Sequence, residues 1–236
     1  MAINNLNFKI WSQCGSMLVF LFLLTSCYSP KLNEEQIQNI SSDFSKSELE
    51  FFHELAFKNE ITAKTVKLKK WDKNIKIGLT GEYIKEDSLE VNKITNELNE
   101  IINTVEINTT TFDDSNLKIH FISYQEFDKY HKYATMGTHG FFLIKYDFSN
   151  KITSGIILIN KSLTGNERNS TIRNEISNSL GLINDSYKYP LSAFQQFENK
   201  NITYAEIDKK VISLLYNYSL SPGMDGTHFK ECFLEK

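Results

Sequence analysis

The feature that most constrains this chain is a predicted helix, residues 164–180, that stops at a glycine. Its apolar stripe consists of Ile172, Ile176 and Leu180. Asn174, Glu175 and Asn178 lie off that stripe, and the two asparagines, four residues apart, share one face of the helix. Gly181 allows a left-handed residue after the last turn, so the chain is expected to turn back sharply there.

This spacing resembles the His-Glu-x-x-His zinc helix, with an asparagine at each histidine position. Gly181 and Asn184 extend the similarity to the longer His-Glu-x-x-His-x-x-Gly-x-x-His pattern of the metzincins. In that pattern three histidines hold Zn²⁺ and the glutamate activates the bound water. The resemblance therefore implies Glu175 as the catalytic general base, if the protein is active. It also implies Asn174, Asn178 and Asn184 as relic metal positions.

The amides at these relic positions argue against a zinc enzyme. Amide oxygens are neutral donors, which suit hard cations weakly and zinc poorly. We therefore expect no catalytic zinc and no other cofactor. Asparagine is abundant throughout the chain, so a helix face that is merely solvated is an alternative interpretation of Asn174, Glu175 and Asn178.

Two further segments carry the resemblance. Residues 221–224, Ser-Pro-Gly-Met, resemble the Met-turn that lies below the metal in metzincins, with Met224 as its methionine; an ordinary turn is the alternative. The run Leu-Gly-Leu-x-Asn-Asp-Ser at 180–186, with Glu175 before it and Pro-Gly-Met after it, resembles a family of secreted bacterial proteins of unknown function. Many members of that family lack the zinc histidines.

Asp185 in this run is the best acidic candidate near the relic positions. Together with Glu175 it would form a carboxylate pair or bind a hard cation. Alternatively, it only accepts hydrogen bonds from the amides of its own turn.

The N-terminal sequence predicts export. Residues 17–24 form an apolar run that is too short to span a bilayer, and Leu-Thr-Ser-Cys at 24–27 resembles the lipobox of bacterial lipoproteins. We therefore expect residues 1–26 to be a removed signal peptide and Cys27 to be acylated. Residues 27–46 would form a polar tether and residues 47–236 the zincin-like domain. The expected location is the bacterial cell envelope, at a membrane reached through the lipid anchor.

Charge and cysteine content exclude some functions. A net charge of −3 gives no basic footprint for nucleic acid. With Cys14 removed and Cys27 acylated, Cys232 is the remaining thiol, so no intrachain disulfide is expected. Cys232 also has no histidine partner that the sequence reveals. The chain has five histidines, and the roles of His139 and His228, both in loop-like Gly-Thr-His contexts, stay open.

Hydrophobic periodicity predicts an α+β domain, with a mixed sheet backed by helices and a helical C-terminal part. The predicted strands are 71–81, 117–122, 140–146 and 152–160, and the predicted helices are 47–57, 86–105, 164–180 and 204–218. Asp87 or Ser88 is expected to cap the second helix, and Thr164 with Glu167 to form a capping box. The order is similar to that of a zincin, in which an antiparallel edge strand precedes the zinc helix; 152–160 holds that position here.

These observations favour a membrane-tethered pseudoprotease, whose zincin-like domain has lost zinc catalysis and binds a peptide or protein segment along the edge strand. One alternative is an atypical hydrolase or peptidase that keeps Glu175 as general base, helped by Asp185 or a loop histidine. Another is a cell-envelope interaction module whose resemblance to zincins is only historical.

Overall fold

The computed structural model describes residues 29–58, 65–132, 134, 139–196 and 201–235. The predicted signal peptide and Cys27 lie outside these ranges. In this part of the chain one sheet contains six strands. They are β1 (Lys70–Trp71), β2 (Ile75–Gly81), β3 (Ile107–Thr109), β4 (Leu117–Ile122), β5 (Gly140–Tyr146) and β6 (Lys151–Asn160). The neighbours β1-β6-β4-β2-β3 pair in parallel, and β5 pairs with β6 antiparallel.

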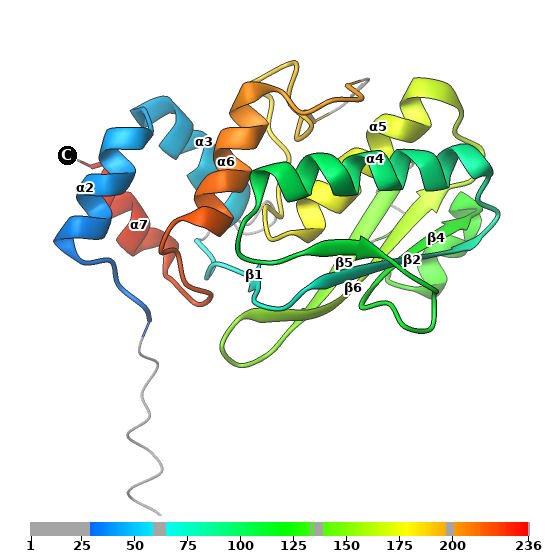
Figure 1. Cartoon of the computed structure of the whole chain (residues 1–236), viewed down its shortest axis with the longest axis horizontal. Helices are drawn as coiled ribbons and strands as arrows, with labels where there is room; N and C mark the ends of the chain where they lie inside the picture. The colour runs from blue at the N-terminus through cyan, green and yellow to red at the C-terminus, as the bar shows by residue number, and fades with distance from the viewer. Residues whose placement is uncertain (1–28, 59–64, 133, 135–138, 197–200, 236) are drawn as a thin grey trace, which may run out of the picture.

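Helices cover the sheet on one face and gather at one end of it (Figure 1). The helices are α2 (Glu34–Asp43), α3 (Lys46–Phe57), α4 (Lys85–Ile101), α5 (Gly165–Ser179), α6 (Glu206–Asn217) and α7 (Gly226–Phe233), with a short 3-10 helix η1 (Tyr124–Lys129). Figure 1 shows α4 and α5 across the sheet, whereas α2, α3, α6 and α7 form a helical group beside it. The prediction of an α+β domain with a mixed sheet backed by helices is therefore confirmed.

Strand β6 is an interior strand of the sheet because it is paired on both sides. Ile157 pairs with Ile119 of β4 and also with Phe142 of β5. Both faces of β6 are buried: Ile157 belongs to the main core, and Leu158 packs with Phe127 in a second, smaller cluster. The prediction that 152–160 is an edge strand is therefore wrong. In the described residues, β6 is the one strand that pairs with β5.

Two other local predictions differ from the structure. The predicted strand at 71–81 is divided, because β1 leaves the line of β2 to pair with β6. The predicted capping box of α5 does not form: Thr164 is the N-cap residue, but its side chain makes no capping bond. Glu167 instead lies 3.0 Å from the ring of His139. At α4 the Asp87 carboxylate accepts the backbone N–H of the N-cap residue Ile84 at 2.7 Å, from within the first turn.

Part of the predicted tether is ordered as α2, which begins with a capping box of Asn33 and Gln36. Ile40 and Phe44 of this segment are buried in the main core, and the Phe44 ring contacts Tyr218 edge-on. The segment therefore packs against the domain from about residue 32 onward. None of the described helices is both long and apolar enough to cross a membrane.

Candidate functional site

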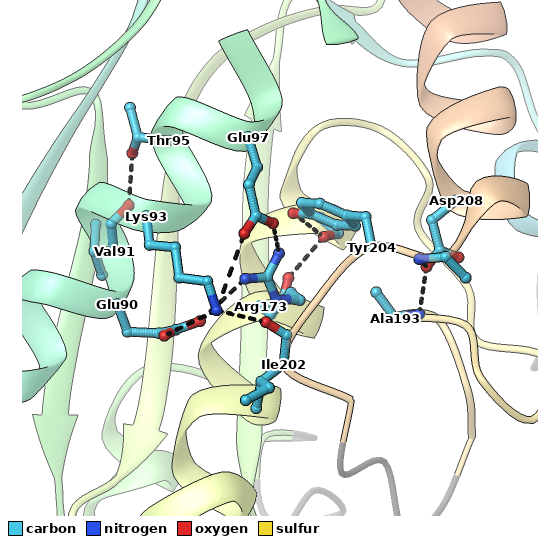
Figure 2. A network of polar contacts seen from close by, with 12 residues as sticks. Glu90, Val91, Lys93, Thr95, Glu97, Arg173, Ala193, Ile202, Tyr204 and Asp208 are labelled. Carbon is cyan, nitrogen blue, oxygen red and sulfur yellow. Dashed lines mark hydrogen bonds and ion pairs between the residues drawn. The ribbon is translucent and has the colours of Figure 1, made fainter. Parts of the chain in front are cut away.

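Helix α5 carries the candidate site and is fixed to α4 by two buried arginines. Arg168 donates two hydrogen bonds to Asp87, at 2.6 and 2.7 Å. Arg173, which is fully buried, binds Glu90 at 3.1 Å and Glu97 at 2.5 Å (Figure 2). Its guanidinium also lies over the Tyr204 ring, 4.5 Å from the centroid. These ion pairs fix the rotation of α5 on the sheet.

The C-terminal end of α5 is held by side chains from β1 and α6. Trp71 Nε1 donates to the Ser179 carbonyl at 2.9 Å, and the Tyr216 hydroxyl donates to the Leu180 carbonyl at 2.8 Å. Gly181 then turns the chain with a φ of 119°. A Cβ at this position would lie 2.1 Å from the carbonyl oxygen of Lys69, so only glycine fits there. The predicted left-handed turn is confirmed.

The second face of α5 is buried rather than solvated. Glu175 is 7% exposed and Asn178 is 3% exposed, so the interpretation of a solvated helix face is wrong. The Nδ2 atoms of Asn174 and Asn178 both donate to Asp185 Oδ1, at 2.9 and 3.1 Å. A carboxylate thus lies against the two amides that occupy the histidine positions of the resembling motif.

Asn184 lies elsewhere. Its Nδ2 donates to the carbonyls of Glu54, Leu55 and Lys58, at 3.2, 3.0 and 2.8 Å, and so closes the C-terminal end of α3. The structure therefore brings Asn174, Asn178 and Asp185 together and places Asn184 outside this group. The neighbouring residue Asp185 takes the position by the helix that the spacing assigned to Asn184.

Glu175 is a buried acid beside the first residue of β5. A Cβ at Gly140 would lie 2.5 Å from Glu175 Oε1 and 2.8 Å from its Cγ, so the missing side chain of the glycine makes room for this carboxyl. The Glu175 carboxyl forms no hydrogen bond with another side chain in the described ranges. Burial, and secondarily the negative charge of Asp185, raises the pKa of Glu175 well above its usual value. A buried carboxyl with a raised pKa is a candidate for general acid–base chemistry.

The atoms near Asp185 that could bind a metal ion are carboxylate and amide oxygens. Asn178 Oδ1 is buried and has no hydrogen-bond partner. Within the described residues, no three His, Cys, Asp or Glu side chains converge as a metal site would need. The group of Glu175, Asp185 and the two amides contains no histidine or cysteine, and most protein zinc sites use these ligands.

A clasp that the sequence did not reveal holds the loop over this cluster. Asp208, near the start of α6, accepts hydrogen bonds from the Ser192 hydroxyl at 2.5 Å and from the Ala193 and Ala205 amides at 2.9 Å. Figure 2 shows the bond from Ala193. Asn174 Nδ2 donates in turn to the Ala193 carbonyl at 2.9 Å. Burial raises the pKa of Asp208, while these hydrogen bonds oppose the shift. The one sequence signal for the clasp was an aspartate near a predicted helix start.

Met224 and the end of α5 contact the same short backbone segment, residues 68–69. Its carbonyl accepts the N–H of Leu68 at 2.9 Å, and Gly223 donates back to the Leu68 carbonyl at 2.8 Å. The next residue, Lys69, is the one whose carbonyl abuts Gly181. Met224 itself is buried at 1% exposure. The Pro-Gly-Met bend and the helix end therefore contact one short stretch of chain from two sides.

His139 and His228 contact residues outside this cluster. His139 pairs with Glu167 near the start of α5. His228 Nε2 accepts the N–H of Leu32 at 3.3 Å and lies 3.6 Å from Cys232 Sγ. The expectation that Cys232 has no histidine partner is wrong, because both residues lie on α7, four positions apart.

Together these contacts define a class of protein: an α+β domain whose sheet-covering helix carries a buried acid and two asparagines bound to a second carboxylate. The chain belongs to the family described as "Protein of unknown function (DUF2927)", which matches residues 46–234. The expected relationship to a family of unknown function is thereby confirmed.

Comparison with solved structures finds similarity to two structures of myroilysin, titled "Crystal structure of myroilysin" and "Structure of Myroilysin". Each is 14% identical, with a TM-score of 0.41 over 63% of this chain, and the match covers 86% and 82% of the respective myroilysin chains. No curated protein matches.

Proposed function

We propose that this protein is an exported lipoprotein, anchored through Cys27 in the bacterial cell envelope. Its zincin-like domain would have exchanged its zinc ligands for amides, and it binds a peptide or protein segment along β5. The bound segment adds a strand to the sheet, so that backbone hydrogen bonds supply affinity and neighbouring side chains supply specificity. No cofactor takes part in this binding.

The observation that carries the proposal is the position of β5. Among the described strands it pairs with β6 alone. The backbone N–H and C=O groups along its other edge are therefore not paired with another described strand. Its first residue, Gly140, lies against Glu175. A segment laid along β5 would therefore run towards the buried acid. The two asparagines are already bound to Asp185, which supports a site without catalytic zinc.

Hydrogen exchange with selected peptides tests this function. The purified chain is panned against a displayed library of random peptides, and amide exchange is compared with and without the strongest binder. Protection should rise across Gly140–Tyr146. Strand β3, Ile107–Thr109, pairs with β2 alone among described strands and serves as the matched control. A library that yields no binder, or protection confined to β3 or to the helices, would contradict the proposal.

The raised pKa of Glu175 favours a second candidate, an atypical hydrolase that uses this carboxyl as its general base. Its test is turnover of a peptide or ester library in the presence of a chelator. Activity that survives chelation and is lost in Glu175→Gln supports the hydrolase. Activity that Glu175→Gln leaves unchanged rejects it.

A further inference from the structure

The hairpin between β5 and β6 ends in an exposed aromatic tip. Phe148 has a relative exposure of 109%, the highest among the large hydrophobic side chains of the described residues, and Tyr146 beside it is 50% exposed. A side chain held this far from the core contributes little to folding. An exposed aromatic pair on a soluble domain is typical of a surface that meets an apolar phase or a partner.

The backbone of the tip is held in one conformation. Asp147 Oδ1 accepts the N–H groups of Ser149 at 2.8 Å and Lys151 at 3.0 Å. Asn150 adopts a left-handed conformation with a φ of 63°. Because the turn is already ordered, moving the Phe148 side chain from water into an apolar environment costs little additional backbone entropy.

The surroundings of the tip are rich in lysine. Lys69 Nζ lies 4.9 Å from the centroid of the Tyr146 ring. The lysines around the hairpin base include Lys69, Lys70, Lys73, Lys145 and Lys151. The opposing carboxylates are Asp72, which pairs with Lys151 at 2.7 Å, and Asp147, which is used in the turn. The balance is positive, and anionic headgroups are attracted to such a rim around an apolar tip.

The N-terminal end of the described chain lies close to the β5–β6 hairpin. A Cβ at Gly223 would lie 3.4 Å from the Ser149 carbonyl oxygen of the hairpin and 3.7 Å from Pro30 Cδ. Figure 1 shows the blue start of the chain and the β5–β6 hairpin at the lower side of the molecule. Cys27 precedes Pro30 by three residues, which span at most about 11 Å. An acyl chain on Cys27 would therefore enter the membrane close to Phe148.

We propose that the hairpin tip, Tyr146–Phe148, inserts into the headgroup region of an anionic lipid bilayer and forms a second contact beside the lipid anchor. This inference rests on the proposed anchoring at Cys27. A single lipid anchor leaves the domain free to tilt on the membrane. An anchor together with an inserted tip fixes the orientation of the domain, and so determines which of its faces points away from the membrane. The loop of residues 185–196, which covers the candidate site, lies on the opposite, upper side in Figure 1.

The test uses the full lipoprotein, extracted from membranes and reconstituted into vesicles of phosphatidylethanolamine and phosphatidylglycerol with brominated acyl chains. Phe148→Trp reports on the tip. Leu191→Trp is the matched control, because Leu191 is 72% exposed on the opposite loop. Wild-type protein, with buried Trp71, supplies the background. Tryptophan emission in Phe148→Trp should shift to the blue and be quenched several-fold more strongly than in Leu191→Trp.

Each other outcome rejects the inference in a distinguishable way. If wild-type protein floats with the vesicles but both tryptophans are quenched equally weakly, the tip is not inserted while the anchor stands. If the blue shift grows with protein concentration without vesicles, the tip binds a second copy instead. If the chain carries no lipid by mass spectrometry and does not float, the anchor is rejected and the inference with it. Peptide binding along β5 is measured separately and survives any of these results.

Discussion

Among single residues, Glu175 has the most distinctive electrostatics. Burial and Asp185 raise its pKa in the folded state, whereas in the unfolded chain a glutamate titrates at about 4.3. The folded state therefore holds this proton to higher pH than the unfolded state does. It follows that the free energy of unfolding falls as pH rises from about 4 through the folded-state pKa.

Glu175→Gln removes the ionisation and keeps the shape of the side chain. The variant should be more stable than wild type at neutral pH, on the order of 1–3 kcal/mol, with a difference that shrinks as pH falls towards 4. Urea unfolding at a series of pH values from 4 to 8 measures it. Glu231→Gln, at an exposed position on α7, should change stability by less than about 0.5 kcal/mol at every pH. A stability difference between Glu175→Gln and wild type that does not vary with pH would contradict the raised pKa of Glu175.

A single backbone position sets how element α5 ends. Gly181 and Gly165 both have a positive φ, of 119° and 57°. A Cβ at Gly181 would collide with the Lys69 carbonyl, whereas a Cβ at Gly165 meets nothing within 4 Å. Gly165→Ala should therefore cost only the left-handed conformation, about 1–2 kcal/mol. Gly181→Ala should cost several kcal/mol or prevent folding, as thermal unfolding would show. Equal losses of stability in Gly181→Ala and Gly165→Ala would contradict the expected collision with the Lys69 carbonyl.

The packing of α5 on α4 depends on the ion pairs of Arg173. Arg173→Met leaves the buried Glu90 without its partner, at an expected cost of about 3–5 kcal/mol. Lys93 approaches the same two carboxylates, at 4.0 Å from each, but from the exposed side (Figure 2). Lys93→Met should therefore cost less than about 1 kcal/mol. Denaturant unfolding compares the two variants. The double variant Arg173→Met, Glu90→Gln should recover part of the loss; no recovery would reject the pairing as its cause.

The elements that the sequence predicted well are those defined by local patterns. Strands 117–122 and 140–146 have the predicted limits, because local apolar patterns mark them without help from other segments: an alternating pattern in the first and a continuous apolar run in the second. Strand β3 covers three residues and gave no such pattern. The interior place of β6 was not predictable from its own residues, because it depends on β4 and β5 pairing on either side.

The candidate site was predictable only in part, for a related reason. The spacing on α5 identified Asn174, Glu175 and Asn178, which share a helix regardless of the rest of the fold. The choice between Asn184 and Asp185 depends on α3, whose carbonyls bind Asn184 from 126 to 130 residues away in the sequence. The Asp208 clasp likewise joins α6 to a loop. Contacts between residues that are so far apart in the sequence leave no periodic pattern from which they could be predicted.

At the scale of the whole molecule, the helical group and the sheet are joined at their boundary, so we expect them to unfold together. Trp71 connects β1 to the end of α5, and residues 223–224 pair with Leu68 just before β1. Phe229 of α7 lies deep in the helical group, with its ring centroid 5.3 Å from those of Phe52 and Phe57. Phe229→Ala should therefore lower the stability of the entire domain, by about 3–5 kcal/mol.

Two probes test whether this loss is shared by both parts. Far-UV circular dichroism reports on all the helices, and Trp71 fluorescence reports on the boundary with the sheet. In Phe229→Ala both signals should change at one lowered denaturant midpoint, as one cooperative transition requires. Phe148→Ala, which removes an equally large but fully exposed ring, should leave that midpoint within about 0.5 kcal/mol of wild type. Separate midpoints for the two probes would show that the helical group folds independently of the sheet.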